Sequence, residues 1–227
     1  SSSFSVGLVN AIHALNGDRI TKYSLASEAA EIELDILCRH MGKQDHFAAA
    51  YGAFNVFTFN ADETVRVEPV YYDPDVVEAL NESLMLFYMG TQRNASDILR
   101  SQVEATARKE SVLTAMQEMV DPMVEILSGR GDLADVGPML HESWLLKRSI
   151  TDQTSNDSID HAYRTAMEAG SSGGKLAGAG GGGFLMLFVA PDRQDAVSEA
   201  LSGLSFIRPG FDTAGSRITY YEPDRLT

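Results

Sequence analysis

The stretch "KLAGAGGGGF", residues 175–184, places five glycines within the six positions 178–183. Glycine adopts backbone conformations with positive φ and lets another group approach the backbone closely. A bend or a close packing contact would account for two or three of these glycines. Five of them indicate that a ligand or another backbone segment comes very near, so the stretch is a candidate binding loop.

The surroundings of this loop argue against two common phosphate-binding motifs. "GAGGGG" fits G-x-G-x-x-G formally, but the dinucleotide fingerprint needs a strand before the glycines and a helix after them. The apolar pattern predicts the reverse order, with a helix leading into Lys175 and the strand "FLMLFVAP" leaving at Phe184. The sequence contains no G-x-x-x-x-G-K-[ST] motif either. A Rossmann site and a Walker A site are therefore both disfavoured.

Composition limits the classes of protein to consider. A chain of 227 residues with 44% hydrophobic content is a globular protein of one large or two modest domains. Its net charge of −14 argues against non-specific nucleic-acid binding, which needs clustered Lys and Arg. The longest apolar run, residues 185–190, is too short to span a bilayer, and the N-terminus lacks signal-peptide features. We expect a cytoplasmic protein in which the single Cys38 is a buried core residue.

Hydrophobic periodicity predicts an α+β chain with a domain boundary near residue 71, separating residues 1–70 from 71–227. In the first part we expect helices over 4–15 and 24–40, then the strand pair "VFTF" and "VRVEPV" around the turn "NADET". In the second part we expect the strand "ESLMLFYMG", helices broken near Asp121 and closed at Gly129, and further helices over "ADVGPMLHESWLLKRS" and 159–169. After "FLMLFVAP", the helix "DRQDAVSEALSGL" precedes a turn and a closing strand within "FIRPGFDTAGSRITYYE".

Three serines, Ser1, Ser2 and Ser3, stand at the start of the first predicted helix. One serine is enough to cap a helix through a hydroxyl that accepts a backbone N–H bond. The alternative is an anion site, because free N–H groups and the helix dipole favour phosphate there. Both interpretations stay open on local evidence.

Two acids stand out from the solvated charges. Glu33 lies at the margin of the apolar stripe of its helix, among small residues, and a half-buried carboxylate needs either a structural Lys or Arg partner or a metal. Asp45 is the only acid in "GKQDHFAAAYGAFN". It either caps a short helix beginning near Phe47 or orients a substrate hydroxyl as a base.

Three separated motifs resemble those of the GHMP kinases, which phosphorylate galactose, mevalonate, homoserine and related small alcohols. "SSSFSVGL" is similar to the end of the family's P-x-x-x-G-L-G-S-S phosphate loop, "KQDHFAAAYGAFN" to its acidic substrate motif, and "KLAGAGGGGF" to its C-terminal glycine loop. The ordered set covers essentially the whole chain. The resemblance implies that residues 1–70 are an incomplete N-terminal domain with a fold like that of ribosomal protein S5. In the family this domain binds ATP and substrate. It also implies that residues 71–227 are a ferredoxin-like α/β C-terminal domain.

The resemblance also implies roles for particular residues. Ser1 falls where the family's loop serine reaches the phosphates and Mg²⁺, with Ser2 and Ser3 beside it. Glu33 lies twelve residues before Asp45, as the magnesium-binding acid does in sugar-kinase members, and Asp45 matches the acid that accepts or orients the reacting hydroxyl. ATP would meet the glycine loop at Gly178, Gly180, Gly181 and Gly182. Candidates for sugar or phosphate contacts are Gln44, Tyr51, Gly52, Arg93, Lys147 and Lys175, of which the three cations could equally be surface charges.

Within the family, "SSSFSVGL", "GKQDHFAAAYGAFN", "FYMGTQRNASDIL" and "HESWLLKR" are most similar to the bacterial heptose 7-phosphate kinases. That likeness implies ATP-dependent phosphorylation of the anomeric hydroxyl, giving a heptose 1,7-bisphosphate for nucleotide-activated heptose. The alternatives are a kinase of a fucose-like or galactose-like sugar, and an inactive fragment that binds a sugar or anion. The implied partners are a sugar phosphate and ATP, without nucleic acid or membrane, and a homodimer stays open.

The chain departs from the family pattern at its N-terminus. The segment that supplies the family's first strands, the G-L-G of its phosphate loop and part of the nucleotide pocket does not precede Ser1. Phosphate loops depend on consecutive backbone N–H groups. We therefore expect this chain to be an incomplete kinase that is inactive by itself.

Overall fold

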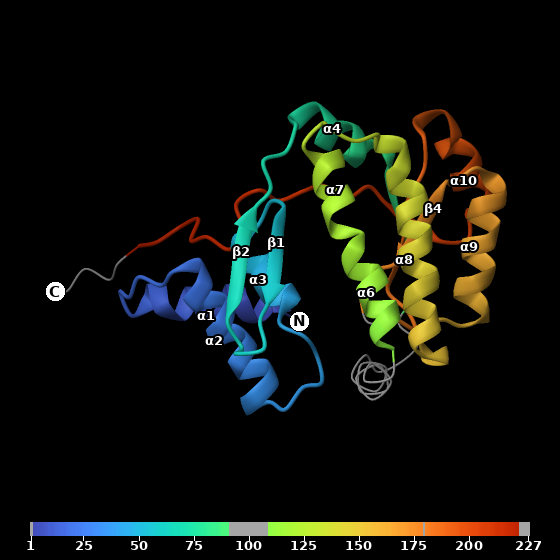
Figure 1. The fold of residues 1–227 in the computed structure, drawn as a ribbon. Coiled ribbons are helices and arrows are strands. Elements are labelled where there is room, and N and C mark those ends of the chain that lie inside the picture. Colours follow the sequence, from blue (N-terminus) through green and yellow to red (C-terminus); the bar gives the residue numbers. More distant parts are fainter. Residues whose placement is uncertain (1, 91–108, 179, 223–227) are drawn as a thin grey trace. The chain divides into compact units, whose positions relative to one another are not determined.

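The computed structural model describes residues 2–90, 109–178 and 180–222, which form two compact units. Unit 1 contains the described residues up to Val70 together with 211–222, and unit 2 extends from Tyr71 to Gly210 (Figure 1). The expected boundary near residue 71 coincides with this division. Residues 211–222 were expected with the second part, but they belong to unit 1 because they bond to its backbone.

The described part of unit 1 consists of helices and a β-hairpin. Its elements are α1 (Ser2–Leu15), α2 (Lys22–Glu31), the π-helical turn η1 (Ile32–Ile36), α3 (Gln44–Tyr51), β1 (Asn55–Phe59) and β2 (Val65–Pro69). The strands pair antiparallel, as predicted. Ala26, Ala29 and Ala50 are almost fully buried, so small side chains let the helices approach closely around Phe47.

Helix α1 confirms the helix expected over 4–15, and Gly17 ends it at φ +77°. Its buried side chains are Ser2, Val6 and Val9. Phe4, by contrast, is 73% exposed. The buried face therefore includes a serine, so the apolar spacing found the helix but not its packed face.

The helix expected over 24–40 is shorter in the structure. Helix α2 ends at Glu31, and the wider turn η1 follows it, closed by a bond from Leu37 N to the carbonyl of Ile32. Cys38 then takes φ +50° and is exposed. The expectation of a buried cysteine is wrong because the helical segment ends at Ile36 and leaves Cys38 in an exposed connection.

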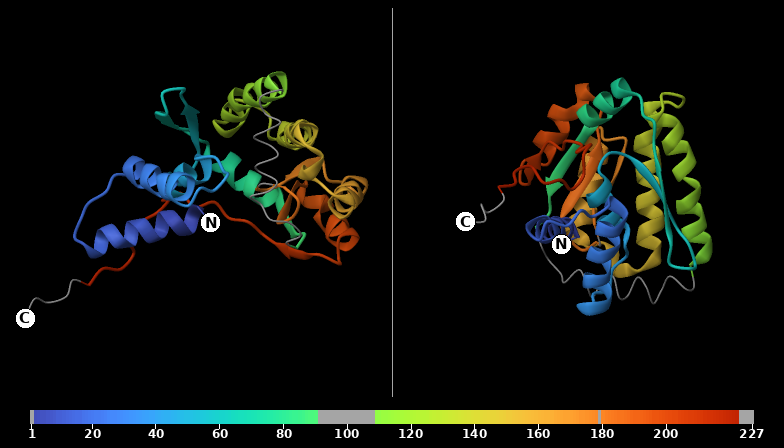
Figure 2. Two further views of the ribbon diagram at one scale, coloured as in Figure 1. Left: turned by 90° about the horizontal axis from the view of Figure 1, so that it is seen from below. Right: turned by 90° about the vertical axis from the view of Figure 1, so that its left-hand side faces the viewer.

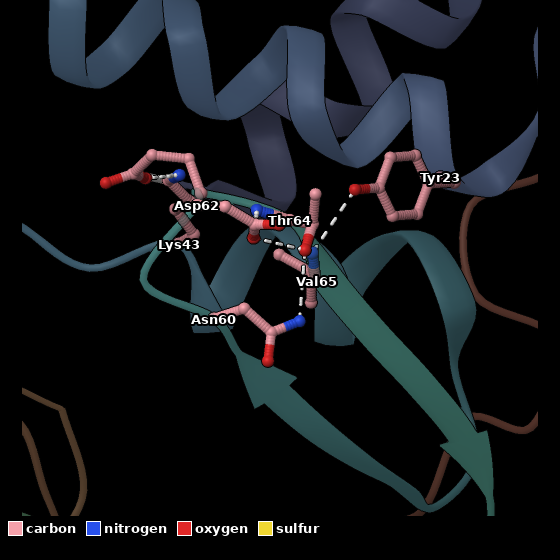
Figure 3. A network of polar contacts seen from close by, with 7 residues as sticks. Tyr23, Lys43, Asn60, Asp62, Thr64 and Val65 are labelled. Atoms are coloured by element: carbon pink, nitrogen blue, oxygen red, sulfur yellow. Dashed lines mark hydrogen bonds and ion pairs between the residues drawn. The ribbon is translucent and has the colours of Figure 1, made fainter.

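The β1–β2 turn is held by side chains that lie close together in Figure 3. The Asp62 carboxylate accepts hydrogen bonds from the backbone N–H and the hydroxyl of Thr64. Val65 N donates to the Tyr23 hydroxyl at 3.3 Å, and Lys43 forms an ion pair with Glu63. These contacts fix the turn predicted at "NADET" against helices α2 and α3.

The C-terminal segment returns to unit 1 as an irregular strap over 211–216. Ala53 N donates to the Asp212 carbonyl at 2.7 Å, and Ser216 N donates to the Ala49 carbonyl at 2.9 Å. The described residues 211–222 contain no strand, so the closing strand expected there is wrong. Their backbone groups bond to the end of α3 instead of to a sheet edge.

Unit 2 contains an antiparallel sheet of β3 (Leu84–Tyr88), β4 (Gly173–Leu176), β5 (Phe184–Phe188) and β6 (Ser205–Ile207), in the order β4-β5-β3-β6. Because β3 and β6 are the first and last strands along the chain, this is the split β-α-β ferredoxin-like order that the resemblance implied. The helices are α4 (Pro74–Ser83), α6 (Glu110–Glu118), α7 (Val120–Leu127), α8 (Val136–Ile150), α9 (Asp157–Ala169) and α10 (Gln194–Ala200). Short 3₁₀ turns are η2 (Leu133–Asp135), η3 (Asp152–Thr154) and η4 (Pro191–Arg193).

The core of unit 2 lies on one face of this sheet. Register places Met85 opposite Leu187 and Phe87 opposite Leu185, and these four side chains are buried. Helix α8 packs along β4, and α6 lies beside α8 (Figures 1 and 2). None of the helices in the described part of the chain is long and apolar enough to cross a bilayer.

Candidate active site

The glycine loop joins β4 to β5, so it is the connection of an antiparallel hairpin. The expectation that a helix leads directly into Lys175 is wrong, because α9 ends at Ala169 and β4 begins at Gly173. Strand β4 begins with Gly173 and Gly174, so the apolar pattern of the sequence does not reveal it. Since a strand, and not a helix, follows the loop, the structure has no Rossmann arrangement here.

The loop needs glycine for its conformation. Gly178, Gly180, Gly181 and Gly183 have φ of +84°, +117°, +71° and +100°. At Gly180 another backbone is also close, since an added Cβ would lie 2.9 Å from the Thr154 carbonyl oxygen. At Gly178 an added Cβ would meet nothing within 4 Å, and this residue is exposed. One end of the loop is therefore packed on its own unit, and the other end faces open space.

Lys147 holds the open end of the loop. Its ammonium group, on α8, donates to the Gly178 carbonyl. At the other end, the backbone bonds Gly183 N to Gly90 O and Met89 N to Gly183 O measure 2.9 and 2.8 Å. Lys147 thus supports the loop directly, while its predicted contact with phosphate or sugar stays a prediction.

Lys175 lies on β4 opposite Met186. Its ammonium nitrogen is 3.4 Å from the Ser143 hydroxyl of α8. Burial lowers the pKa of the Lys175 ammonium, because water is replaced by protein around the charge. A partly buried ammonium beside a neutral hydroxyl suits an anionic ligand, so the predicted role of Lys175 also stays a prediction.

Among the described acids of unit 1, Glu33 is the most deeply buried, with 1% of the residue exposed. It lies in η1, and its Oε2 is 2.8 Å from Nε2 of the fully buried His46. Its Oε1 is 3.4 Å from a guanidinium nitrogen of Arg39. The sequence predicted that this carboxylate needs a partner, and the structure supplies an Arg, the structural alternative, together with a histidine that the sequence analysis missed.

Asp45 lies in the first turn of α3 and is exposed. The helix begins at Gln44 after Lys43, so Asp45 does not cap a helix beginning near Phe47. Among the described residues its carboxylate forms no hydrogen bond or ion pair.

Gln44, one residue earlier, lines a hollow of about 440 Å³. The hollow lies between η1, the start of α3 and the β1–β2 turn, and its walls are Leu34, Gly42, Lys43, Gln44, Phe59, Asn60, Glu63 and Thr64. The predicted substrate contact of Gln44 is therefore next to an open volume. Asp45 is not one of these lining residues.

Tyr51 and Gly52 end helix α3. Burial, and secondarily the neighbouring Tyr23, raise the pKa of the Tyr51 hydroxyl, so it stays protonated at neutral pH. Gly52 packs against the strap, since an added Cβ would be 2.1 Å from Gly215 N. This backbone contact accounts for glycine at position 52, and the predicted substrate contacts of both residues stay predictions.

The serines lie at the N-terminus of α1. Ser2 is the first residue of the helix and is buried, whereas Ser3 is exposed. Ser1 and Arg93, both predicted to contact ligands, lie outside the described residues. Both interpretations of these serines, helix capping and anion binding, therefore stay open.

The described residues suit Mg²⁺ only as an ion that a bound nucleotide brings with it. Across residues 2–90, 109–178 and 180–222 no three His, Cys, Asp or Glu side chains form a metal cluster. Mg²⁺ is often held by one or two carboxylates, with phosphate and water oxygens completing the octahedron. Glu33 offers one buried carboxylate of this kind, so a magnesium ion carried by a nucleotide fits and a protein-only metal centre does not.

Residues 115–205, all within unit 2, match the family described as GHMP kinases C terminal. The chain contains a GHMP kinase C-terminal domain. This confirms the family that the motifs predicted, including the glycine loop at 175–184 that lies inside the matched range.

Two relatives of this chain are named sugar kinases. The D-glycero-alpha-D-manno-heptose 7-phosphate kinase of Campylobacter jejuni is 30% identical over 203 residues, covering 88% of this chain and 60% of that kinase. The galactokinase of Pyrococcus furiosus is 27% identical over 232 residues, covering 88% of this chain and 63% of that enzyme. This chain thus spans about three fifths of the length of either relative.

A solved structure agrees with these matches. The D-glycero-D-manno-heptose 1-phosphate kinase from Bacteroides thetaiotaomicron superposes with a TM-score of 0.70 at 25% identity, covering 97% of this chain and 63% of that one. The α+β GHMP kinase fold is therefore shared across nearly all of this chain.

Proposed function

We propose that the protein containing this chain is an ATP-dependent sugar kinase that phosphorylates the anomeric hydroxyl of a heptose 7-phosphate. The observation that carries the proposal is the 30% identity with the Campylobacter jejuni heptose 7-phosphate kinase over 88% of this chain. The proposed product is a heptose 1,7-bisphosphate. Galactose-like or fucose-like sugars are the competing substrates, since the Pyrococcus furiosus galactokinase is nearly as similar.

In the proposed reaction the sugar hydroxyl oxygen forms a bond to the γ-phosphorus while the bond from that phosphorus to the β,γ-bridging oxygen breaks. ADP leaves with the bonding electron pair, and the hydroxyl proton moves to the Asp45 carboxylate. Asp45 suits this role because it is exposed and its carboxylate forms no bond to other described residues. Phosphoryl transfer depends mainly on positioning and charge stabilisation.

The remaining proposed roles concern the nucleotide. Backbone N–H groups of Gly178, Gly180, Gly181 and Gly182 would bind its phosphates, supported by the Lys147 bond to the loop. Glu33 would hold the Mg²⁺ of Mg·ATP through one carboxylate oxygen. When bound, that ion neutralises phosphate charge.

The test measures ADP release by the full-length protein with heptose 7-phosphate, heptose 1-phosphate, galactose and fucose. We expect turnover with heptose 7-phosphate, and a preference for another sugar would overturn the substrate assignment. Binding of the sugar phosphate without turnover would favour the non-catalytic alternative.

Asp45→Asn tests the proposed base. The variant should lower kcat at least 100-fold with little change in melting temperature, because the side chain is exposed. Asp75→Asn is the matched control, since Asp75 is also an exposed acid in the first turn of a helix. Near-equal rates for Asp45→Asn and the wild type would remove Asp45 from the mechanism.

A further inference from the structure

His46 follows the proposed base directly in sequence, yet its side chain points to the opposite environment. Asp45 is exposed, whereas His46 is fully buried, with 0% of the residue accessible. Its Nε2 lies 2.8 Å from Glu33 Oε2, and the Glu33 side chain is 2% exposed. One turn of α3 therefore exposes the Asp45 carboxylate to solvent and bonds, through His46, to the buried Glu33 carboxylate.

The hydrogen-bonding pattern shows which ring nitrogen of this histidine is engaged. Nδ1 of His46 is buried and has no partner in the described part of the chain. Nε2 contacts Glu33, and because a carboxylate oxygen accepts hydrogen bonds, Nε2 is the donor of this bond.

The backbone around Glu33 is less regular than an α-helix. Glu33 lies within η1, whose closing bond runs from Leu37 N to the carbonyl of Ile32, and Arg39 N bonds to the Glu33 carbonyl at 2.9 Å. Turns of this π-helical kind often occur at functional sites. The His46 bond fixes one carboxylate oxygen of Glu33 to α3, and the other oxygen lies 3.4 Å from a guanidinium nitrogen of the half-exposed Arg39.

We propose that His46 is a positioning residue, which holds the Glu33 carboxylate in register with helix α3 and thereby fixes where Glu33 meets the magnesium of Mg·ATP relative to Asp45. This rests on the proposed function, in which Glu33 is the magnesium ligand and Asp45 the base. A carboxylate whose one oxygen is held by a buried N–H donor keeps its second oxygen in a defined direction. The hydrogen-bond partners of metal ligands commonly act in this way.

The test uses the full-length protein and three substitutions. His46→Phe keeps a ring without a donor, His46→Gln places an amide N–H near the position of imidazole Nε2, and Glu33→Gln removes the charge. Two quantities are measured: the Mg²⁺ concentration for half-maximal kinase rate, and Mn²⁺ binding in the presence of ATP, from the electron paramagnetic resonance signal of free Mn²⁺. We expect His46→Phe to raise the half-maximal Mg²⁺ concentration about 10- to 100-fold and to weaken Mn²⁺ binding, and His46→Gln to restore both to within about threefold.

Glu33→Gln separates this inference from the proposed function. If His46 acts through Glu33, His46→Phe should add little in the Glu33→Gln background. Unchanged metal dependence in Glu33→Gln would refute the metal role in the proposed function. A clear effect of Glu33→Gln with no effect of His46→Phe, other than a lower melting temperature, would overturn the inference and leave His46 as a structural residue.

If His46→Phe does not fold, His46→Asn and His46→Gln provide a second comparison. His46→Asn is too short to bring its amide to the Nε2 position, so it should fail where His46→Gln succeeds. Equal metal dependence of these two variants would also refute the positioning role.

Discussion

Gly173 of β4 packs directly against Gly137 of helix α8: a Cβ added to Gly173 would lie 1.8 Å from the Gly137 carbonyl oxygen. The Gly137 oxygen is a backbone atom, and the Cβ position is set by the backbone of Gly173, so the clash is relieved only by shifting β4 or α8. We expect Gly173→Ala to lower the free energy of unfolding by about 3 kcal/mol or more, as overpacked interiors do. Urea denaturation measures this change.

Gly178→Ala is the matched control for that substitution. Gly178 also belongs to the β4–β5 hairpin, but an added Cβ meets no atom within 4 Å there. Only its φ of +84° disfavours alanine, at a cost of about 1 kcal/mol. Equal urea midpoints for the two alanine variants would contradict the close contact between Gly173 and Gly137.

The Tyr163 hydroxyl makes the stability of unit 2 sensitive to alkali. Burial raises its pKa to about 12, and it bonds to His141 Nδ1 at 2.7 Å. A phenol with a raised pKa contributes stability below its unfolded pKa of about 10 and loses it as pH rises toward 12. The difference in unfolding free energy between the wild type and Tyr163→Phe should therefore shrink between pH 10 and pH 12. A constant difference across that window would show that Tyr163 titrates normally.

Lys147 should affect nucleotide binding more than folding. Lys147→Met removes the bond to the Gly178 carbonyl at the open end of the loop. We expect the KM for ATP to rise about tenfold while the unfolding free energy changes by about 1 kcal/mol or less. Arg164→Met is the control, because Arg164 is an exposed cation on α9. An unchanged KM for ATP in Lys147→Met would show that this anchor does not shape the nucleotide site.

Lys22 ties the strap to helix α3. Its ammonium donates to the carbonyls of Tyr51 and Ala214, at 2.7 Å each. Lys22→Met should lower the unfolding free energy by about 1 kcal/mol and speed amide hydrogen exchange at the Ser216 N–H. Unchanged exchange at that position would indicate that the backbone bonds to Ala49 and Ala53 and the glycine contact at Gly52 and Gly215 hold the strap without Lys22.

The sequence predicted most elements because local patterns decide them. Alternating apolar residues found β1 and β2, and Gly17 and Gly129 end helices at positive φ as expected. Strand β4 was missed because its first two residues are glycines, which close packing against α8 requires but no apolar pattern shows. A glycine contact of this kind depends on residues far apart in sequence.

The candidate site was predictable where a residue's own neighbours reveal its environment. The small residues around Glu33 indicated burial, and the structure confirms it. His46 was missed because its partner lies thirteen residues away on another element. A signal was present all the same, since a histidine within "DHFAAAY" shares the buried side of the helix with Phe47 and Ala50.

The strap also determines when each unit can be completed during synthesis. Every described residue of unit 2 lies between Tyr71 and Gly210, while unit 1 requires residues on both sides of that interval. Domains commonly fold in the order in which they leave the ribosome. For unit 1 the final step falls outside that order. The partners of Ala49 and Ala53 on the strap, Ser216 and Asp212, are made only after the whole of unit 2, so the described part of unit 1 is completed after unit 2 although its synthesis starts earlier.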